Sequence, residues 1–147
     1  MPWFAGSDRS ELRRAWCEAW RRHRHGLPLE PLQLQLAEVA AEHPEYHGLL
    51  EARLAAIEQD WSPEAGATNP FLHMGLHLAV REGLATDRPA GVRELFARLL
   101  ETRGSRHEAE HVLLECLGET LWEAQRAGLP PDEQSYLARA AARTRSR

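Results

Sequence analysis

Six of the eight histidines form pairs with a four-residue spacing, and these pairs are the strongest chemical signal in the sequence: His43/His47, His73/His77 and His107/His111. A random order of eight histidines in a chain of this length would give about 0.4 such pairs. Two pairs continue the spacing into a carboxylate, with Glu51 after His47 and Glu115 after His111. Side chains four residues apart lie on one face of a helix, so each segment would present its donors along one line.

Three such faces meeting inside a helical bundle would supply enough donors for two or more metal ions. Imidazole mixed with carboxylate, without thiolate, suits iron, and zinc or manganese would also fit. Bundle interiors are also where proteins build di-iron sites. Pro44 would turn His43 off the line made by His47 and Glu51. We therefore expect one multinuclear, non-haem metal site with this ligand set: His43, His47, Glu51, His73, His77, His107, His111 and Glu115.

The leading functional hypothesis follows from this donor set. Iron held by nitrogen and carboxylate donors keeps exchangeable positions, so the site would bind or activate dioxygen or nitric oxide. The pattern does not distinguish an enzyme from a sensor or an iron store, and it leaves the substrate, the redox partner and the oligomeric state open. It also leaves open whether His43 and Glu119 are ligands.

The third histidine pair supports a second hypothesis. Residues 107–111 read His-Glu-Ala-Glu-His, the pattern of zinc metallopeptidases in which both histidines bind zinc and the glutamate, here Glu108, is the base. The motif lies at an expected helix start, and no substrate-binding strand is evident beside it. A third hypothesis is a metal-free interaction module whose histidines fill a polar seam. Haem binding by two histidines is less attractive because carboxylates lie nearby.

The helix expected to organise the others covers residues 70–84. Asn69 is a good N-cap, Pro70 suits the first helical position, and the run from Phe71 to Val80 is apolar almost all round, as in a buried helix. A kink or a fresh start is expected at His43-Pro44. The pattern predicts an all-α, antiparallel bundle of about six helices. The others are expected at about 8–25, 32–42 (resuming over 46–57 after the kink), 90–102, 106–127 and 132–143.

Composition describes an ordinary globular protein. A chain of 147 residues suits a single domain, with residues 143–147 as a frayed tail. The net charge of −4 argues against a nucleic-acid partner, and no apolar run is long enough for a transmembrane helix. The N-terminus lacks the features of a signal peptide, which predicts a cytoplasmic location. Cys17 and Cys116 are too few for a disulfide framework, and we expect both to be reduced.

Five segments resemble a bacterial family, the domain-of-unknown-function family numbered 1841: residues 12–20, 43–47, 69–77, 87–93 and 111–125. The resemblance covers most of the chain and implies no established activity. The metal-site pattern is also similar in style to hemerythrin-like and other di-iron helical bundles. Their vocabulary of His-x3-Glu and His-x3-His is present, although the order of the motifs departs and the fourth-helix His-x4-Asp is missing.

Overall fold

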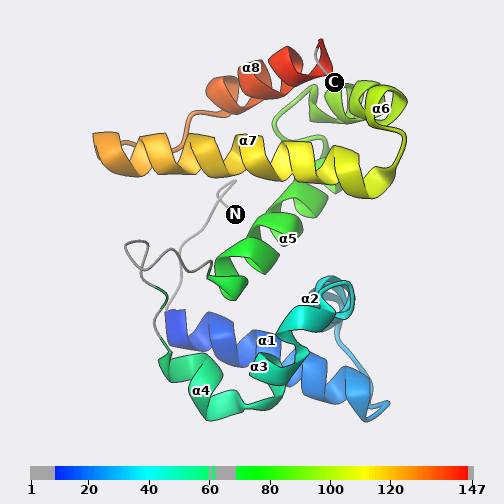
Figure 1. The fold of residues 1–147 in the computed structure, drawn as a ribbon, viewed down its shortest axis with the longest axis vertical. Helices are drawn as coiled ribbons and strands as arrows, with labels where there is room; N and C mark the ends of the chain where they lie inside the picture. Colours follow the sequence, from blue (N-terminus) through cyan, green and yellow to red (C-terminus); the bar gives the residue numbers. More distant parts are fainter. Residues whose placement is uncertain (1–8, 60, 62–68, 146–147) are drawn as a thin grey trace. The chain divides into compact units, whose positions relative to one another are not determined.

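The computed structural model describes residues 9–59, 61 and 69–145, and every regular element in these residues is helical (Figure 1). The all-α prediction is therefore confirmed. The chain forms two compact units, the N-terminal unit Gly6–Leu78 and the C-terminal unit Ala79–Arg147. None of the helices in these ranges combines the length and apolar character that a membrane crossing requires. The sequence also suggests a helix cap at Asp8 and a loop over Ser62–Thr68, and both of these lie outside the described residues.

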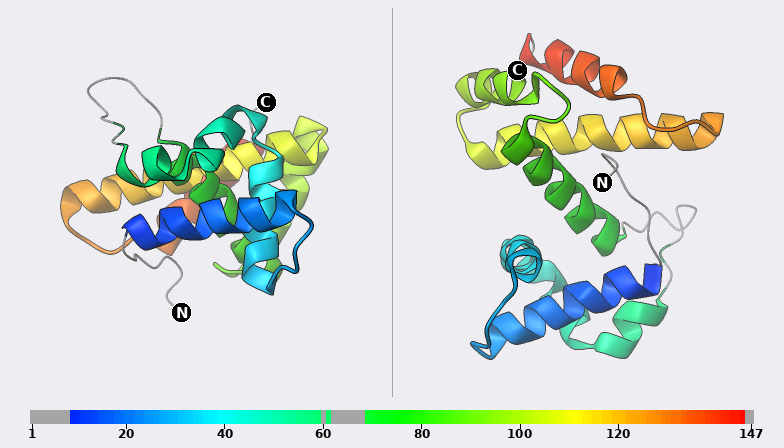
Figure 2. Two further views of the ribbon diagram at one scale, coloured as in Figure 1. Left: turned by 90° about the horizontal axis from the view of Figure 1, so that it is seen from below. Right: turned by 180° about the vertical axis from the view of Figure 1, so that it is seen from behind.

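The N-terminal unit is built around the first helix. Helix α1 packs against α2, α3 and α4, and these helices lie beside it in Figures 1 and 2. The first half of α5 adds Phe71 and Met74 to the same apolar core, which includes Trp16, Leu36 and Val39. The elements of this unit are α1 (Arg9–Arg24), α2 (Pro31–Ala41), the 3-10 helix η1 (Pro44–Tyr46), α3 (His47–Glu51), α4 (Arg53–Glu58) and the start of α5 (Pro70–Thr86).

The single segment predicted over residues 46–57 is instead two short helices, because the backbone leaves the helical region at Ala52 (φ −97°, ψ 67°). A buried arginine secures the second of them. Arg13 on α1 is only 2% exposed, and its guanidinium donates to the carbonyl oxygens of Ile57 and Gln59 at 3.0 and 2.8 Å. The last carbonyls of a helix lack hydrogen-bond donors within the helix, and the Arg13 guanidinium supplies donors to the carbonyls at the end of α4.

The C-terminal unit contains the end of α5 together with α6 (Val92–Arg103), α7 (Arg106–Ala127) and α8 (Glu133–Thr144). Helices α7 and α8 lie side by side and run in opposite directions (Figure 1). Ser105, a residue type typical of N-caps, accepts from the backbone N–H of Glu108 and caps α7, and Asp132 accepts from that of Gln134 and caps α8 rather than lying in it as predicted. Of the predicted frayed tail, Arg143 and Thr144 lie in α8.

The connection from α5 to α6 differs from the prediction. Helix α5 runs on to Thr86, and α6 begins at Val92 rather than directly after Pro89. Asp87 has a positive φ of 51°, and its carboxylate accepts hydrogen bonds from the backbone N–H groups of Gly91 and Arg93. The Arg93 guanidinium in turn donates to the Leu84 carbonyl at 2.7 Å. One short loop thus caps the end of α5 and the start of α6.

Candidate metal centre

Three histidines meet in the N-terminal unit. His43, His73 and His77 each offer a ring nitrogen, and these three nitrogens all lie within 4.8 Å of one another. His77 is 1% exposed and His43 is 5% exposed, while His73 is partly buried. Among the residues that the structure describes, this is the group of three or more histidine, cysteine or acidic side chains close enough to share one metal ion.

His43 is positioned by the break between α2 and η1. It is the residue before η1, and its backbone (φ −125°, ψ 68°) lies outside the helical region, as expected before Pro44. Its Nδ1 lies 2.7 Å from the carbonyl oxygen of Val39, one turn back in α2. A carbonyl can only accept, so Nδ1 carries a proton, and in the neutral ring Nε2 keeps the lone pair. This is how ligating histidines are commonly oriented in metal sites.

His73 and His77 are positioned by the start of α5. Asn69 accepts from the backbone N–H of Phe71 at 2.9 Å, so the predicted N-cap is confirmed. The buried Phe71 and Met74 anchor this end of the helix in the core of the N-terminal unit. The two histidines lie one turn apart on α5, with their Nε2 atoms 3.2 Å from each other.

Tyr46 borders the cluster, and the spacing of the histidines and carboxylates did not predict it as a site residue. Its ring is parallel to that of His43 at a centroid distance of 5.5 Å and meets His73 edge-on at 6.2 Å. Burial, followed by the charge of Glu45, raises the pKa of the Tyr46 phenol, so the neutral form is favoured at neutral pH. The stacking of Tyr46 on His43 depends on the turn of η1, which the sequence does not reveal. The only signal for Tyr46 was its place between the two histidines of His-Pro-Glu-Tyr-His.

His47 and Glu51 are not part of this cluster. The Nε2 of His47 donates to the Ala40 carbonyl at 2.8 Å, and its ring stacks on Trp20 at 4.1 Å. Glu51 accepts from the indole N–H of Trp20 at 3.2 Å and lies 3.6 Å from Arg24. Both side chains therefore belong to a polar group around Trp20. The four-residue spacing does not align His43 with His47, because the chain is not one continuous helix there.

The third pair lies in the C-terminal unit, in the first turns of α7. The rings of His107 and His111 are 4.6 Å apart, with His107 exposed and His111 partly buried. Glu108 is exposed, and Glu115 forms an ion pair with Arg143 of α8 at 2.9 Å. Within the described part of this unit, no further side chain completes a three-ligand group with the pair.

A buried ion pair in the same region was missed from the sequence. Glu110 is 3% exposed, and its carboxylate receives two hydrogen bonds from the Arg81 guanidinium, at 2.7 and 3.3 Å. The partners are far apart in the sequence, and only the burial of Glu110 on α7 distinguishes it from its exposed neighbours. Further along α7, Glu119 and Glu123 form ion pairs with Arg139 of α8.

Comparisons with known proteins identify a family. A family model described as "Domain of unknown function (DUF1841)" matches residues 8–142, which confirms the resemblance found in the sequence. No curated protein and no solved structure matches the chain. The similarity in style to hemerythrin-like sites is therefore not confirmed.

Proposed function

The chain belongs to the DUF1841 family, and we propose that it is a metal-binding protein whose ion is held by His43, His73 and His77. The observation that carries the proposal is the convergence of three ring nitrogens within 4.8 Å, from two separate segments of one compact unit. Buried imidazoles need polar partners, and a shared cation satisfies three lone pairs at once.

Two distances support the fit of a tetrahedral ion. Two nitrogens bound to one zinc at about 2.0–2.1 Å lie roughly 3.3 Å apart at tetrahedral angles. The Nε2 atoms of His73 and His77 are 3.2 Å apart, close to that separation. The hydrogen bond from His43 to the Val39 carbonyl fixes the ring so that Nε2 is left for the ion. The nitrogen of His43 lies within 4.8 Å of these two atoms, so binding requires the three rings to approach this separation.

The donor set favours one divalent transition-metal ion. Three neutral imidazoles suit zinc or ferrous iron, and manganese, which prefers oxygen donors, is less well matched. Three protein ligands leave a fourth position open. A bound ion would activate water at this position or, if the ion is iron, take dioxygen or nitric oxide. We place this function in the cytoplasm, in keeping with Cys17 and Cys116 as buried free thiols.

The other hypotheses have weaker support. A di-iron site would need bridging carboxylates, whereas Glu51 is engaged by Trp20 and Glu115 by Arg143. The multinuclear site formed by all eight predicted ligands, from His43 to Glu115, stays a prediction. The zinc hydrolase would need a third ligand beside His107 and His111, and the described C-terminal unit offers no such group.

Elemental analysis with a zinc titration of the full chain tests the proposal. We expect about one tightly bound ion per chain, and we expect His77→Ala to weaken binding by at least about tenfold because one of three ligands is lost. His107→Ala is the matched control: it removes one member of the other four-residue pair and should leave the tight site intact.

Other results would overturn the proposal or redirect it. If His77→Ala binds zinc as tightly as the unchanged chain, the cluster is not the site. Two irons per chain, lost on substitution of Glu51 or Glu115, would restore the di-iron hypothesis. One zinc that is lost in His107→Ala would favour the hydrolase.

A further inference from the structure

A small pocket in the N-terminal unit is separate from the three-histidine cluster. It has a volume of about 80 Å³ and lies between α1 and the segment where α3 meets α4. Cys17, Trp20 and Leu50 form its buried apolar lining. Organic ligands of drug size need roughly 300–1,000 Å³, so this pocket suits one small ion.

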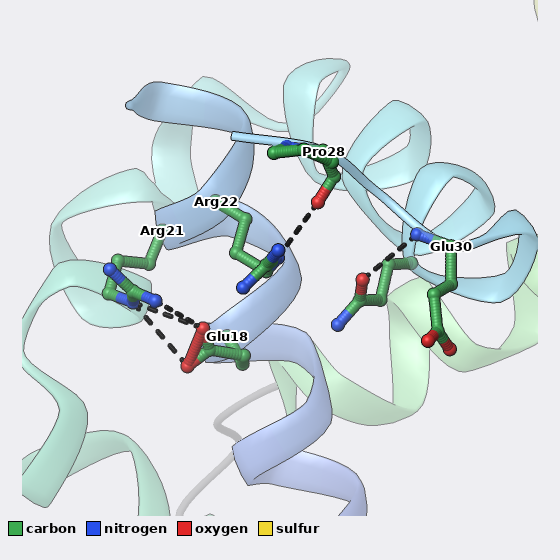
Figure 3. A network of polar contacts seen from close by, with 6 residues as sticks. Glu18, Arg21, Arg22, Pro28 and Glu30 are labelled. Carbon is green, nitrogen blue, oxygen red and sulfur yellow. Dashed lines mark hydrogen bonds and ion pairs between the residues drawn. The ribbon is translucent and has the colours of Figure 1, made fainter. Parts of the chain in front are cut away.

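Three arginines line this pocket, Arg21 and Arg24 on α1 and Arg53 at the start of α4, and all three are exposed residues. Two of them have carboxylate partners. Arg21 is bound to Glu18 at 2.6 Å, an arrangement that Figure 3 shows, and Arg24 lies 3.6 Å from Glu51. Three positive and two negative side chains leave the lining with an excess of one positive charge.

Arg53 supplies that excess charge. Within the described ranges, no carboxylate lies within ion-pair distance of it, although its charge acts on both Cys17 and Glu18. Guanidinium groups present planar pairs of N–H donors that match the oxygens of phosphate and carboxylate. The break at Ala52 places Arg53 at this pocket, because a continuous helix through residues 46–57 would give it another direction.

The thiol in the pocket does not suggest chemistry of its own. Cys17 is 3% exposed, and burial raises its pKa, an effect that the charge of Arg53 only partly offsets. A thiol of raised pKa is a poor nucleophile. The pocket is therefore suited to binding rather than to covalent reaction.

We propose that this pocket binds a small oxyanion, held by the guanidinium groups of Arg53, Arg24 and Arg21 above an apolar floor of Trp20, Leu50 and Cys17. The anion would balance the excess positive charge of the lining and replace part of the water around the exposed Arg53. Phosphate serves as the probe, because its tetrahedral oxygens can accept from all three arginines. This pocket and the three-histidine cluster have no residue in common, so a negative result for phosphate would not affect the metal proposal, and a negative result for metal would not affect this one.

Isothermal titration calorimetry of the full chain with inorganic phosphate, at constant ionic strength and after dialysis against metal-free buffer, tests this proposal. We expect one saturable site per chain. Arg53→Ala should weaken it about tenfold, since a charge-assisted hydrogen bond is lost. Arg14→Ala is the matched control, because Arg14 is an exposed arginine of α1 that does not line the pocket.

A second measurement locates the ion. The indole N–H of Trp20, assigned in NMR spectra with a Trp20→Phe variant, should shift on phosphate addition in the unchanged chain and in Arg14→Ala, but not in Arg53→Ala. Equal weakening in both arginine variants would mean nonspecific charge attraction and would overturn the proposal. So would phosphate shifts that leave Trp20 unaffected, or no saturable binding at all. Binding of vesicles that contain phosphatidic acid would identify a lipid headgroup as the source of the same phosphate chemistry.

Discussion

The two halves of α5 carry polar side chains at the same spacing and use them differently. His73, His77 and Arg81 follow one another at four-residue intervals. In the N-terminal unit, His73 and His77 meet a third imidazole, that of His43. In the C-terminal unit, Arg81 forms an ion pair with the buried Glu110. Imidazoles have lone pairs that can share one cation, whereas a guanidinium has only donors and needs an anion. The four-residue spacing therefore places side chains on one helix face, and the residue that packs against this face, His43 or Glu110, determines whether a cation site or an ion pair can form.

The largest effect is expected in the C-terminal half of α5. Arg81→Met would remove the guanidinium that pairs with the buried Glu110 carboxylate, and we expect a loss of about 3 kcal/mol in the free energy of unfolding. This is at the low end for buried pairs because the Arg81 side chain is 22% exposed. Urea denaturation measures the loss, and it should be the same with and without metal.

Two variants check the cause of this loss. The double variant Arg81→Met/Glu110→Leu should recover much of the stability, because apolar replacement of a buried pair is often neutral. Arg98→Ala, which breaks the exposed pair with Glu94, should cost less than about 0.5 kcal/mol. A double variant that is less stable than Arg81→Met would contradict the charge-burial explanation.

The N-terminal half should respond to metal instead. Zinc at 100 times its dissociation constant should raise the free energy of unfolding by about 2.7 kcal/mol, since it binds only the folded chain. His77→Ala should lose this increment. Arg81→Met should keep it, although that variant starts from a lower stability. The same zinc increment in the unchanged chain and in His77→Ala would remove the distinction between the two halves.

Much of the fold was predictable because it depends on local chemistry. Asn69 and Ser105 are residues that favour the N-cap, and the helices that follow them begin where this preference predicts. The histidine pair of α5 also followed from local spacing, because Pro70–Thr86 is one continuous helix. These features depend on residues within one or two turns, so a single sequence contains the necessary information.

The rest of the candidate site depends on backbone breaks and long-range contacts. The four-residue spacing predicts that His43 and His47 share a helix face, but the non-helical backbone of His43 separates them and brings His43 to His73 and His77 instead. Glu51 is held by Trp20, which lies 31 residues earlier in the chain. Arg81 and Glu110 are separated by 29 residues. No periodic pattern encodes such pairings, because they arise only when helices pack.

Two glycines of α5 provide a smaller, purely steric comparison of its halves. A Cβ on Gly83 would lie 2.6 Å from the carbonyl oxygen of Arg88, whereas one on Gly75 would meet nothing within 4 Å. Gly83→Ala should therefore cost about 2 kcal/mol, because the backbone of the following loop must move. Gly75→Ala should stabilise the helix by about 0.5–1 kcal/mol. Thermal unfolding of the two variants measures both effects, and equal melting temperatures would contradict the close approach.

The smallest expected effect is on the loop that follows α5, and it should appear as a pH dependence of the melting temperature. Hydrogen bonds from the backbone N–H groups of Arg93 and Gly91 lower the pKa of the Asp87 carboxyl. A lowered folded-state pKa stabilises the protein above the ordinary aspartate pKa, and this contribution is lost as the pH falls through the folded-state value.

Asp87→Asn keeps a residue that tolerates the positive φ but removes the charge. In the metal-free protein, its melting temperature should lie below that of the unchanged chain at neutral pH, and the gap should close as the solution is acidified through that range. A gap that stays constant down to acidic pH would mean that Asp87 acts through its shape and not its charge.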